Sequence, residues 1–328
     1  MGLFQQPAWS SISVGGTPMT LLPRTRTAYF NGRFALETDI VIPYRDRSFN
    51  RGDGCFDMTR TFDGRIFRLE EHVERLYRSL RYLSIDIGLE PKEMVAITEQ
   101  VVERNEPLRA AAGDWWVAQR ISRGVDAIGD EGWEHTGPQV IVDCTPLPLR
   151  KRAALFRDGI EVAVSSIRRT PPSMLSPRAK THNYLNLILA DREVKTARPE
   201  AWSILLDEHG NLCEGVGSNI FVVRGERVYT PREQYVLPGV SRRTVIELAG
   251  RLGIPCEERD LDVYDAVTAD EVFLTSTSLC ICGVRSVNSQ LIGDGRIPGP
   301  ITRRLTDAYV ALVGTDFVAQ YLSRLSSS

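Results

Sequence analysis

The sequence predicts an α+β protein that folds as two domains. Short apolar runs flank turn signals such as Asn31-Gly32 and Asp63-Gly64, a pattern that is typical of paired strands. Single segments with helical spacing of apolar residues separate these groups of strands. With 328 residues the chain is long enough to bury two cores. We expect the boundary between them near residue 148, in the stretch 146–152, which is turn-rich and then basic.

The N-terminal half is expected to begin with an extension. Residues 1–24 are rich in Pro, Gly, Ser and Thr without sustained periodicity, so we expect them to lie on the surface or on a partner subunit. Apolar runs flank both turns named above, which predicts two hairpins, over residues 27–34 and 55–67. The later elements expected in this half are helices over 73–83 and 92–105 and strands over 115–121 and 139–144.

The C-terminal half repeats this alternation of strands and helices. Strands are expected over residues 160–167, 201–206, from 212 onward, 219–223, 227–230 and 271–275. Helices are expected over 183–197, 241–252 and 301–314. Two domains, 25–148 and 149–328, therefore follow the extension.

Composition excludes several classes of protein. The chain is 42% hydrophobic and 25% charged with a formal net charge of −2, which argues against a general nucleic-acid binder because such proteins need excess basic charge. No apolar run approaches the roughly 18–20 residues that span a bilayer. The N-terminus lacks the charged start and apolar stretch of a signal peptide. We therefore expect a cytoplasmic protein with no nucleic-acid or membrane partner.

Cysteine and histidine spacing gives no indication of a metal site. The six cysteines are scattered through a large chain, so a disulfide scaffold is not expected. Cys280 and Cys282 form a C-x-C pair without a second pair, and the four histidines show no ligand spacing. Buried thiols in a reducing compartment are the simpler interpretation.

Three local patterns carry candidate chemistry, and each also has an ordinary structural explanation. Lys180 opens a helix and is either a surface lysine or an amine able to form a Schiff base. Residues 237–244 lead into a helix and either provide an ordinary N-cap through Ser241 or leave backbone N–H groups free to hold a phosphate. Glu214 lies beside glycines, either in a plain turn or where a flat ligand approaches closely.

Together with two further segments, these patterns resemble class IV aminotransferases, the fold-type IV enzymes that use pyridoxal 5′-phosphate. That group includes branched-chain and D-amino acid aminotransferases, (R)-selective amine transaminases and aminodeoxychorismate lyase. The resemblance covers roughly residues 28–314. The segments that carry it are residues 67–76, Lys180-x-x-Asn-Tyr184, Glu214-Gly-x-Gly-x-Asn-Ile-Phe, Leu237-Pro-Gly-Val-Ser-Arg and Glu271-Val-Phe-Leu-Thr-Ser-Thr277-Ser278.

The resemblance implies roles for three side chains at the cofactor ring. Lys180 matches the lysine that forms the Schiff base and then moves the proton. Glu214 matches the carboxylate that pairs with the pyridine nitrogen and keeps the ring an electron sink. Tyr184 matches the tyrosine near the phenolic oxygen of the cofactor.

The resemblance also implies a phosphate site. Arg75 matches the arginine that binds the phosphate, although on sequence alone a surface ion pair would explain it. The backbone N–H groups of Val240 and Ser241, with Thr277, are expected to complete the site. The implied fold is two α/β domains with the cofactor in the cleft between them, and the implied assembly is a homodimer.

The substrate side combines features of different branches of the family, and its pocket departs from the branched-chain pattern. Phe56, Trp116 and Leu279, with Ser278, are expected to line the pocket. Arg60 is expected either to bind a substrate carboxylate or to pair with Asp57. The motif Lys180-x-x-Asn-Tyr-Leu-Asn is of the branched-chain type.

We therefore expect an aminotransferase that moves an amino group from an apolar amine or amino acid to a 2-oxo acid. Three alternatives stay open: an (R)-selective amine or D-amino acid transaminase, a lyase of the aminodeoxychorismate type, and a cofactor-binding protein without turnover. Asp126, Asp130 and Glu131 follow Arg123 in the next loop, and their charge is expected to disfavour acidic donors at the pocket mouth.

Overall fold

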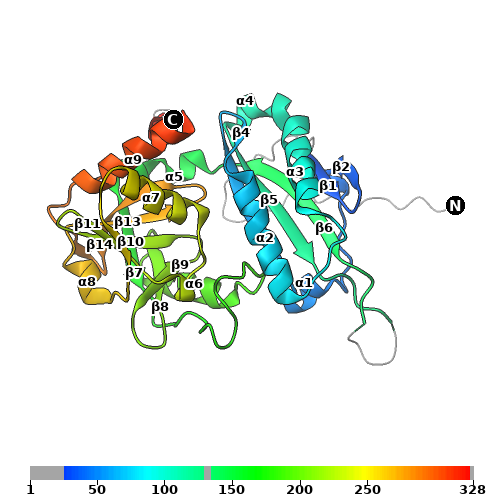
Figure 1. The fold of residues 1–328 in the computed structure, drawn as a ribbon, viewed down its shortest axis with the longest axis horizontal. Coiled ribbons are helices and arrows are strands. Elements are labelled where there is room, and N and C mark those ends of the chain that lie inside the picture. Colours follow the sequence, from blue (N-terminus) through cyan, green and yellow to red (C-terminus); the bar gives the residue numbers. More distant parts are fainter. Residues whose placement is uncertain (1–25, 129–133, 326–328) are drawn as a thin grey trace.

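The computed structural model describes residues 26–128 and 134–325 and shows two lobes lying side by side (Figure 1). The expected extension at residues 1–24, and with it the expectation for its place, lies outside the described residues, as do Asp130 and Glu131. Strands β1 to β6 form one sheet and β7 to β15 form the other. The chain thus passes from one sheet to the other after Pro146, where the sequence changes to a proline-rich and basic stretch.

The N-terminal lobe is an antiparallel sheet with the strand order β2-β1-β6-β5-β3-β4. Its strands are β1 (Thr27–Phe30), β2 (Arg33–Leu36), β3 (Gly54–Phe62), β4 (Arg65–Ile66), β5 (Trp115–Ser122) and β6 (Gln139–Pro146). Its helices are α1 (Arg47–Arg51), α2 (Leu69–Leu83), α3 (Pro91–Asn105) and α4 (Arg109–Ala112), with short 3-10 turns at Glu37–Asp39 and Glu106–Leu108. Both hairpin predictions are confirmed.

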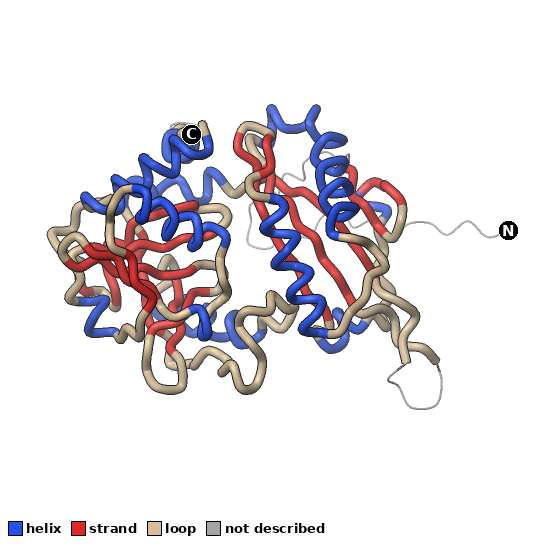
Figure 2. The backbone as a smooth tube through the Cα atoms, in the orientation of Figure 1, coloured by secondary structure: helices blue, strands red, loops and turns tan. Residues whose placement is uncertain are grey.

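Helix α2 lies along one face of this sheet because its apolar residues recur at helical spacing. Leu69, Val73, Leu76 and Leu80 are all buried, whereas Arg78 on the opposite side is exposed. Burying each such side chain contributes about 1.5–3 kcal/mol. Figures 1 and 2 show α2 and α3 packed across the same face of the sheet. The opposite face of this sheet is not covered by α2 and α3, and it faces the C-terminal lobe.

The C-terminal lobe contains a nine-stranded mixed sheet, in which β7 runs parallel to its neighbours β14 and β8. Its strands are β7 (Ile160–Val164), β8 (Trp202–Leu206), β9 (Leu212–Gly215), β10 (Asn219–Arg224), β11 (Arg227–Thr230), β12 (Cys256–Glu258), β13 (Glu271–Ser276), β14 (Cys280–Val287) and β15 (Gln290–Leu291). Its helices are α5 (Leu149–Asp158), α6 (Leu185–Ala197), α7 (Val240–Arg251), α8 (Val263–Val267), α9 (Pro300–Val313) and α10 (Phe317–Leu322), with a 3-10 turn at Glu233–Tyr235.

The expected strands and helices of this lobe are confirmed within a few residues, and the structure adds elements that periodicity did not indicate. Strand β14 lies in the middle of the sheet and is buried along most of its length, so it shows no alternation of apolar and polar residues. Helix α5 begins inside the basic stretch that reads as a boundary, and its Ala153 and Phe156 are buried in the lobe. No helix within residues 26–128 and 134–325 is long and apolar enough to cross a membrane.

Candidate active site

Two adjoining pockets lie where the lobes meet. One, called here the polar pocket, is lined by Arg75, Lys180, Glu214, Ser241 and Thr277 among others. The second, called the aromatic pocket, is lined by Phe56, Met58, Trp116, Arg152, Trp202 and Ser278 among others. Lys180, Tyr184 and Thr277 line both pockets, so the two form one continuous site around the lysine.

Lys180 belongs to the C-terminal half of the chain but is held by the N-terminal lobe. Its backbone N–H donates to Ser79 Oγ on α2 at 3.0 Å, and its carbonyl accepts from the N–H of Phe56 on β3 at 2.9 Å. The next residue, Thr181, forms a bridge with Cys55. Figure 2 shows the loop before α6 reaching across to the N-terminal lobe. These contacts fix the lysine backbone at the edge of β3.

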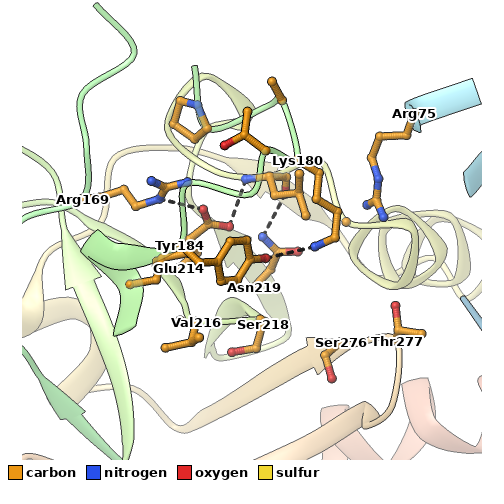
Figure 3. Close-up of a pocket in the computed structure, with 18 of the residues that line it drawn as sticks. Arg75, Arg169, Lys180, Tyr184, Glu214, Val216, Ser218, Asn219, Ser276 and Thr277 are labelled. Carbon is orange, nitrogen blue, oxygen red and sulfur yellow. Dashed lines mark hydrogen bonds and ion pairs between the residues drawn. The ribbon is translucent and has the colours of Figure 1, made fainter. Parts of the chain in front are cut away.

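The amine of Lys180 points into the site beside two aromatic rings. Nζ lies 3.2 Å from the hydroxyl of Tyr184 (Figure 3). It lies 4.5 Å from the ring centroid of Phe56. Tyr184 is the N-cap residue of α6, and its ring lies 5.4 Å from that of Phe56. Lys180 therefore lines the pockets instead of lying on the outer surface, and Tyr184 lies beside its amine.

Glu214 is a buried carboxylate with both oxygens engaged. Oε1 accepts from Arg169 Nε at 2.9 Å, and Oε2 accepts from the backbone N–H of Leu237 at 2.9 Å. Figure 3 shows the carboxylate on the same side of the pocket as the Tyr184 ring. Sequence reasoning missed Arg169, because nothing local in the sequence indicates that this loop residue pairs with Glu214 on β9.

The two asparagines of the lysine motif hold backbone segments. Asn183 Nδ2 donates to the carbonyl of Gly52 at 2.9 Å. Asn186 accepts from the N–H of Thr170 and donates to the carbonyl of Arg168, so it holds the segment that carries Arg169. The motif thus positions the counter-ion of Glu214 as well as the lysine.

The N-terminus of α7 is an open anion site. Its N-cap is Gly239, which has no side chain to cap the helix, and the N–H groups of Val240 and Ser241 have no acceptor among the described residues. The ordinary N-cap through Ser241 is therefore wrong: its Oγ donates instead to the carbonyl of Ser276 at 3.1 Å. A Cβ at Gly239 would lie 2.2 Å from Asn219 Oδ1, so this approach requires glycine. Unpaired N–H groups at a helix start suit a phosphate.

Arg75 faces this helix start from α2, across the cleft. Its Nε and Nη2 each donate to the Asp57 carboxylate at 2.8 Å, and Nη1 donates to the carbonyl of Pro238 at 3.0 Å. It is buried and lines the polar pocket, so the alternative of a surface ion pair is wrong. Thr277 also lines the pocket, with Oγ1 donating to the carbonyl of Met58 at 3.1 Å. A guanidinium and free N–H groups on facing walls fit the phosphate of pyridoxal phosphate.

Asp57 and His72 complete a fully buried cluster behind Arg75. Burial alone would raise the pKa of Asp57, but Arg75 and the hydrogen bond from His72, 2.7 Å away, outweigh it and hold the pKa well below its ordinary value. Burial lowers the pKa of His72, and the opposing hydrogen bond and charge of Asp57 do not outweigh it. The negative charge of Asp57 is thus permanent at neutral pH and fixes the orientation of Arg75.

The aromatic pocket is built from one face of β3 and β5 and from C-terminal segments. Phe56 and Met58 alternate on β3, so both side chains reach the same face. Trp116 comes from β5 and Trp202 from β8. Ser278 contributes from the turn between β13 and β14. Three of the predicted substrate contacts, Phe56, Trp116 and Ser278, therefore lie together.

Arg60 does not line either pocket, which corrects the expectation that it binds a substrate carboxylate. It has the same strand parity as Phe56 and Met58, but its guanidinium is buried and donates to the carbonyl of Ser278 at 3.2 Å and to Gln320 Oε1 at 3.0 Å. The alternative pair with Asp57 is also wrong. The two residues are three apart on β3, so their side chains leave opposite faces of the sheet.

Two further expectations need correction. Leu279 is fully buried in the C-terminal core and is not among the residues that line the two pockets. Asp126 is paired with Arg47 at 2.9 Å and with Arg51, and it lines neither pocket, so its charge is not an isolated charge at the mouth.

The described residues, 26–128 and 134–325, contain no group of three or more side chains that could hold a metal ion.

The sequence matches a known family over most of its length. A model of the amino-transferase class IV family matches residues 54–287. A protein of Methanocaldococcus jannaschii, named provisionally as a branched-chain-amino-acid aminotransferase, is 35% identical over 282 residues, which are 86% of this chain and 94% of that protein.

Solved structures give the same family. The branched-chain amino acid aminotransferase of Escherichia coli superposes with a TM-score of 0.81 and 28% identity, covering 88% of this chain and 95% of that one. The branched-chain amino acid aminotransferase from Thermobaculum terrenum, solved in its PLP-form, gives a TM-score of 0.74 and 26% identity, covering 92% of this chain and 97% of that one.

Proposed function

The chain belongs to the class IV aminotransferases, and we propose that its polar pocket binds pyridoxal 5′-phosphate while its aromatic pocket receives an apolar, branched-chain-type amine or amino acid. The amino group passes to a 2-oxo acid acceptor. The observation that carries this proposal is the position of Lys180 Nζ, which lies where both pockets meet, 3.2 Å from Tyr184.

Five groups of this chain would hold the cofactor. Arg75 and the free N–H groups of Val240 and Ser241, with Thr277 beside them, provide the phosphate end. Glu214 provides a carboxylate for the ring nitrogen, and Arg169 keeps that carboxylate in place. The residues at the phosphate end and the carboxylate at the ring-nitrogen end all line the same pocket.

When bound, pyridoxal phosphate supplies a carbon that accepts the amino group and a ring that delocalises the electron pair freed at the substrate carbon. Lys180 would supply an amine that bonds the cofactor covalently and, when released, would move a proton from the substrate Cα to the cofactor carbon to which the lysine had been bonded. The Tyr184 hydroxyl, within hydrogen-bonding distance, orients that amine. Phe56 and Trp116 exclude water from one wall.

The substrate class is supported by the relatives and by the wall of the aromatic pocket. Relatives with branched-chain names cover most of the chain. Phe56, Met58, Trp116 and Trp202 offer apolar surface, and each methylene buried there contributes roughly 0.8 kcal/mol. An (R)-selective amine donor is the second candidate, because the same wall accepts an aryl group.

Borohydride reduction followed by peptide mapping tests the lysine. Reduction should fix the cofactor on the peptide that contains Lys180, and Lys180→Ala should abolish both the label and amino transfer to 2-oxo acids. A matched control is Lys195→Ala, since Lys195 is a partly exposed lysine at the outer edge of the aromatic pocket, paired with Asp191. A label that survives in Lys180→Ala contradicts the proposal.

We also infer a homodimer in the cytoplasm, with the domain boundary near residue 148. Two groups of large apolar side chains are exposed in the single chain, one on the segment before β3 and one on α6; they are Val41, Tyr44, Phe49, Leu185, Ile188 and Leu189. Burial of these groups by a second copy would account for them. All six cysteines are free, as is usual in a reducing compartment. Sedimentation velocity at micromolar concentration tests the assembly, and a monomer would contradict it.

A further inference from the structure

Arg152 on α5 places a positive charge in the aromatic pocket. Its guanidinium carbon lies 5.1 Å from the ring centroid of Trp116 and 5.3 Å from that of Trp202, so the charge lies against two indoles. Its Nη1 donates to Ser278 Oγ. Sequence reasoning placed Arg152 only in the basic stretch at the domain boundary. The structure brings it into the same pocket as Lys180.

No carboxylate within the described residues pairs with this guanidinium. The two arginines that line the polar pocket do have such a partner: Arg75 pairs with Asp57 and Arg169 with Glu214. The second cation on the wall, Lys195, is already paired with Asp191 at 2.7 Å. Apart from Lys180, the amine proposed to bond the cofactor, Arg152 is therefore the cation of this pocket that lacks an anion among the described residues.

Electrostatics supports the same conclusion. Burial lowers the pKa of Arg152, whereas the pKa of Arg75 is raised because Asp57 outweighs its burial. Removing a cation from water without an anion is unfavourable, so the free protein carries a cost that an anionic ligand would relieve. The indole Nε1–H of Trp116 also lacks an acceptor among the described residues.

We propose that Arg152 binds the carboxylate of the amino acid donor and of the 2-oxo acid acceptor, the task that the sequence suggested for Arg60. This assignment rests on the proposed transaminase function and specifies how the substrate is recognised. A guanidinium offers five N–H donors, and Ser278 uses only one side of it, so donors remain for a carboxylate. The two indoles hold the guanidinium plane in place before the substrate arrives.

Half-reaction kinetics of the holoenzyme separate a carboxylate-binding role from a structural one. Arg152→Met keeps an unbranched apolar chain between the two tryptophans and removes the charge. We expect kcat/KM for leucine and for a 2-oxo acid to fall by about 10- to 100-fold, mainly through KM. A carboxylate-free donor such as (R)-1-phenylethylamine should change by less than about threefold. Arg152→Lys should recover only part of the loss, since a lysine cannot form the planar fork.

The matched control is Lys151→Met on the same helix. Lys151 is exposed and does not line the pocket, so its substitution should leave both donors unchanged. Equal losses for leucine and for the amine in Arg152→Met would overturn the proposal and assign Arg152 a structural role. A selective loss with leucine in Lys151→Met would also overturn the proposal, because the effect would then come from the charge of α5 in general and not from Arg152.

A binding measurement tests Arg152 independently of turnover. Tryptophan fluorescence or calorimetry gives the affinity of 4-methylvalerate and of its uncharged amide for the holoenzyme. The wild type should prefer the carboxylate by about tenfold or more, and Arg152→Met should bind both alike. Retained preference in a folded Arg152→Met protein overturns the proposal. If the wild type transfers no amino group yet shows this preference, the transaminase function fails and the carboxylate site stands.

Discussion

The polar pocket and the aromatic pocket share Lys180 and Tyr184, but their charged groups are satisfied in different ways. In the polar pocket, Glu214 has Arg169 as its partner and Arg75 has Asp57, so the protein itself holds each charge in place. In the aromatic pocket, Arg152 has only a hydroxyl and two indole faces. A resident cofactor suits a site whose charges are fixed beforehand. A substrate that exchanges at each turnover suits a site with one charge left open.

The largest effect should come from removing the charge of Asp57, which breaks the ion pair with Arg75 in the polar pocket. Asp57→Asn leaves buried Arg75 without its anion, and we expect the free energy of unfolding to fall by about 3–5 kcal/mol in urea denaturation. Asp143→Asn is the control, because Asp143 pairs with the partly exposed Arg120 at 2.8 Å and should cost only about 0–1 kcal/mol. Similar losses for the two variants would remove the contrast between a buried and an exposed ion pair.

Glu214→Gln should slow the chemical step more than it weakens cofactor binding. The amide cannot carry the charge opposite a protonated ring nitrogen, and we expect single-turnover deamination of leucine to slow on the order of 100-fold. The control is Glu193→Gln, since Glu193 is exposed and bonds Ser165 and Ser166 outside both pockets. A wild-type single-turnover rate in Glu214→Gln would exclude the ring-nitrogen role.

Arg75→Lys tests whether the proposed phosphate site needs a guanidinium or only a positive charge. A lysine keeps a positive charge near Asp57. It lacks the planar guanidinium, however, so it cannot donate hydrogen bonds to Asp57, to the Pro238 carbonyl and to a phosphate at the same time. We expect cofactor affinity to fall by roughly 1.5 kcal/mol, measured as faster loss during dialysis against buffer without cofactor. Arg78→Lys, on the exposed side of the same helix, should retain the cofactor like the wild type.

The smallest effect is a pH dependence from His182, which lies beneath Phe56 with ring centroids 5.5 Å apart. Burial, with a contribution from Arg120, lowers the pKa of His182 to about 4. The unfolded chain binds this proton near pH 6.5, so the stability contributed by the neutral ring is complete above that pH and is lost as the pH falls toward 4. We expect about 1 kcal/mol less stability at pH 5.5 than at pH 6.5 from this group.

His182→Gln should flatten this part of the pH profile in urea denaturation. His135→Gln should not, because His135 is exposed. An unchanged slope in His182→Gln would mean that the proton is taken up elsewhere in this range.

The sequence predicted what depends on local pattern and missed what depends on distant contacts. Lys180, Glu214 and the start of α7 lie in short motifs, and the structure brings them to one pocket. Arg60 points to the same face of β3 as Phe56 and Met58, but it is covered by Gln320 of α10, 260 residues further along the chain, which no local pattern indicates. Arg152 was hidden because a basic run at the start of a helix usually indicates an exposed surface.

Part of the fold was missed for a related physical reason. Strand β14 is buried on both faces, so period-two alternation, the signal that marks an edge or half-exposed strand, is absent from it. The turn before β14 supplies Ser278 to the aromatic pocket, and this residue was expected there from the family motif although the strand that follows it was not.

The lysine loop has a mechanical consequence. Hydrogen bonds to Ser79, Phe56 and Gly54 tie residues 180–182 to the N-terminal lobe, while Glu214 and the start of α7 belong to the other sheet. Any hinge rotation between the lobes would therefore carry the amine and the Phe56 wall as one rigid body away from the carboxylate and the helix start. The spacing between Lys180 Nζ and Glu214 therefore depends on how the two lobes are arranged and not on either lobe alone.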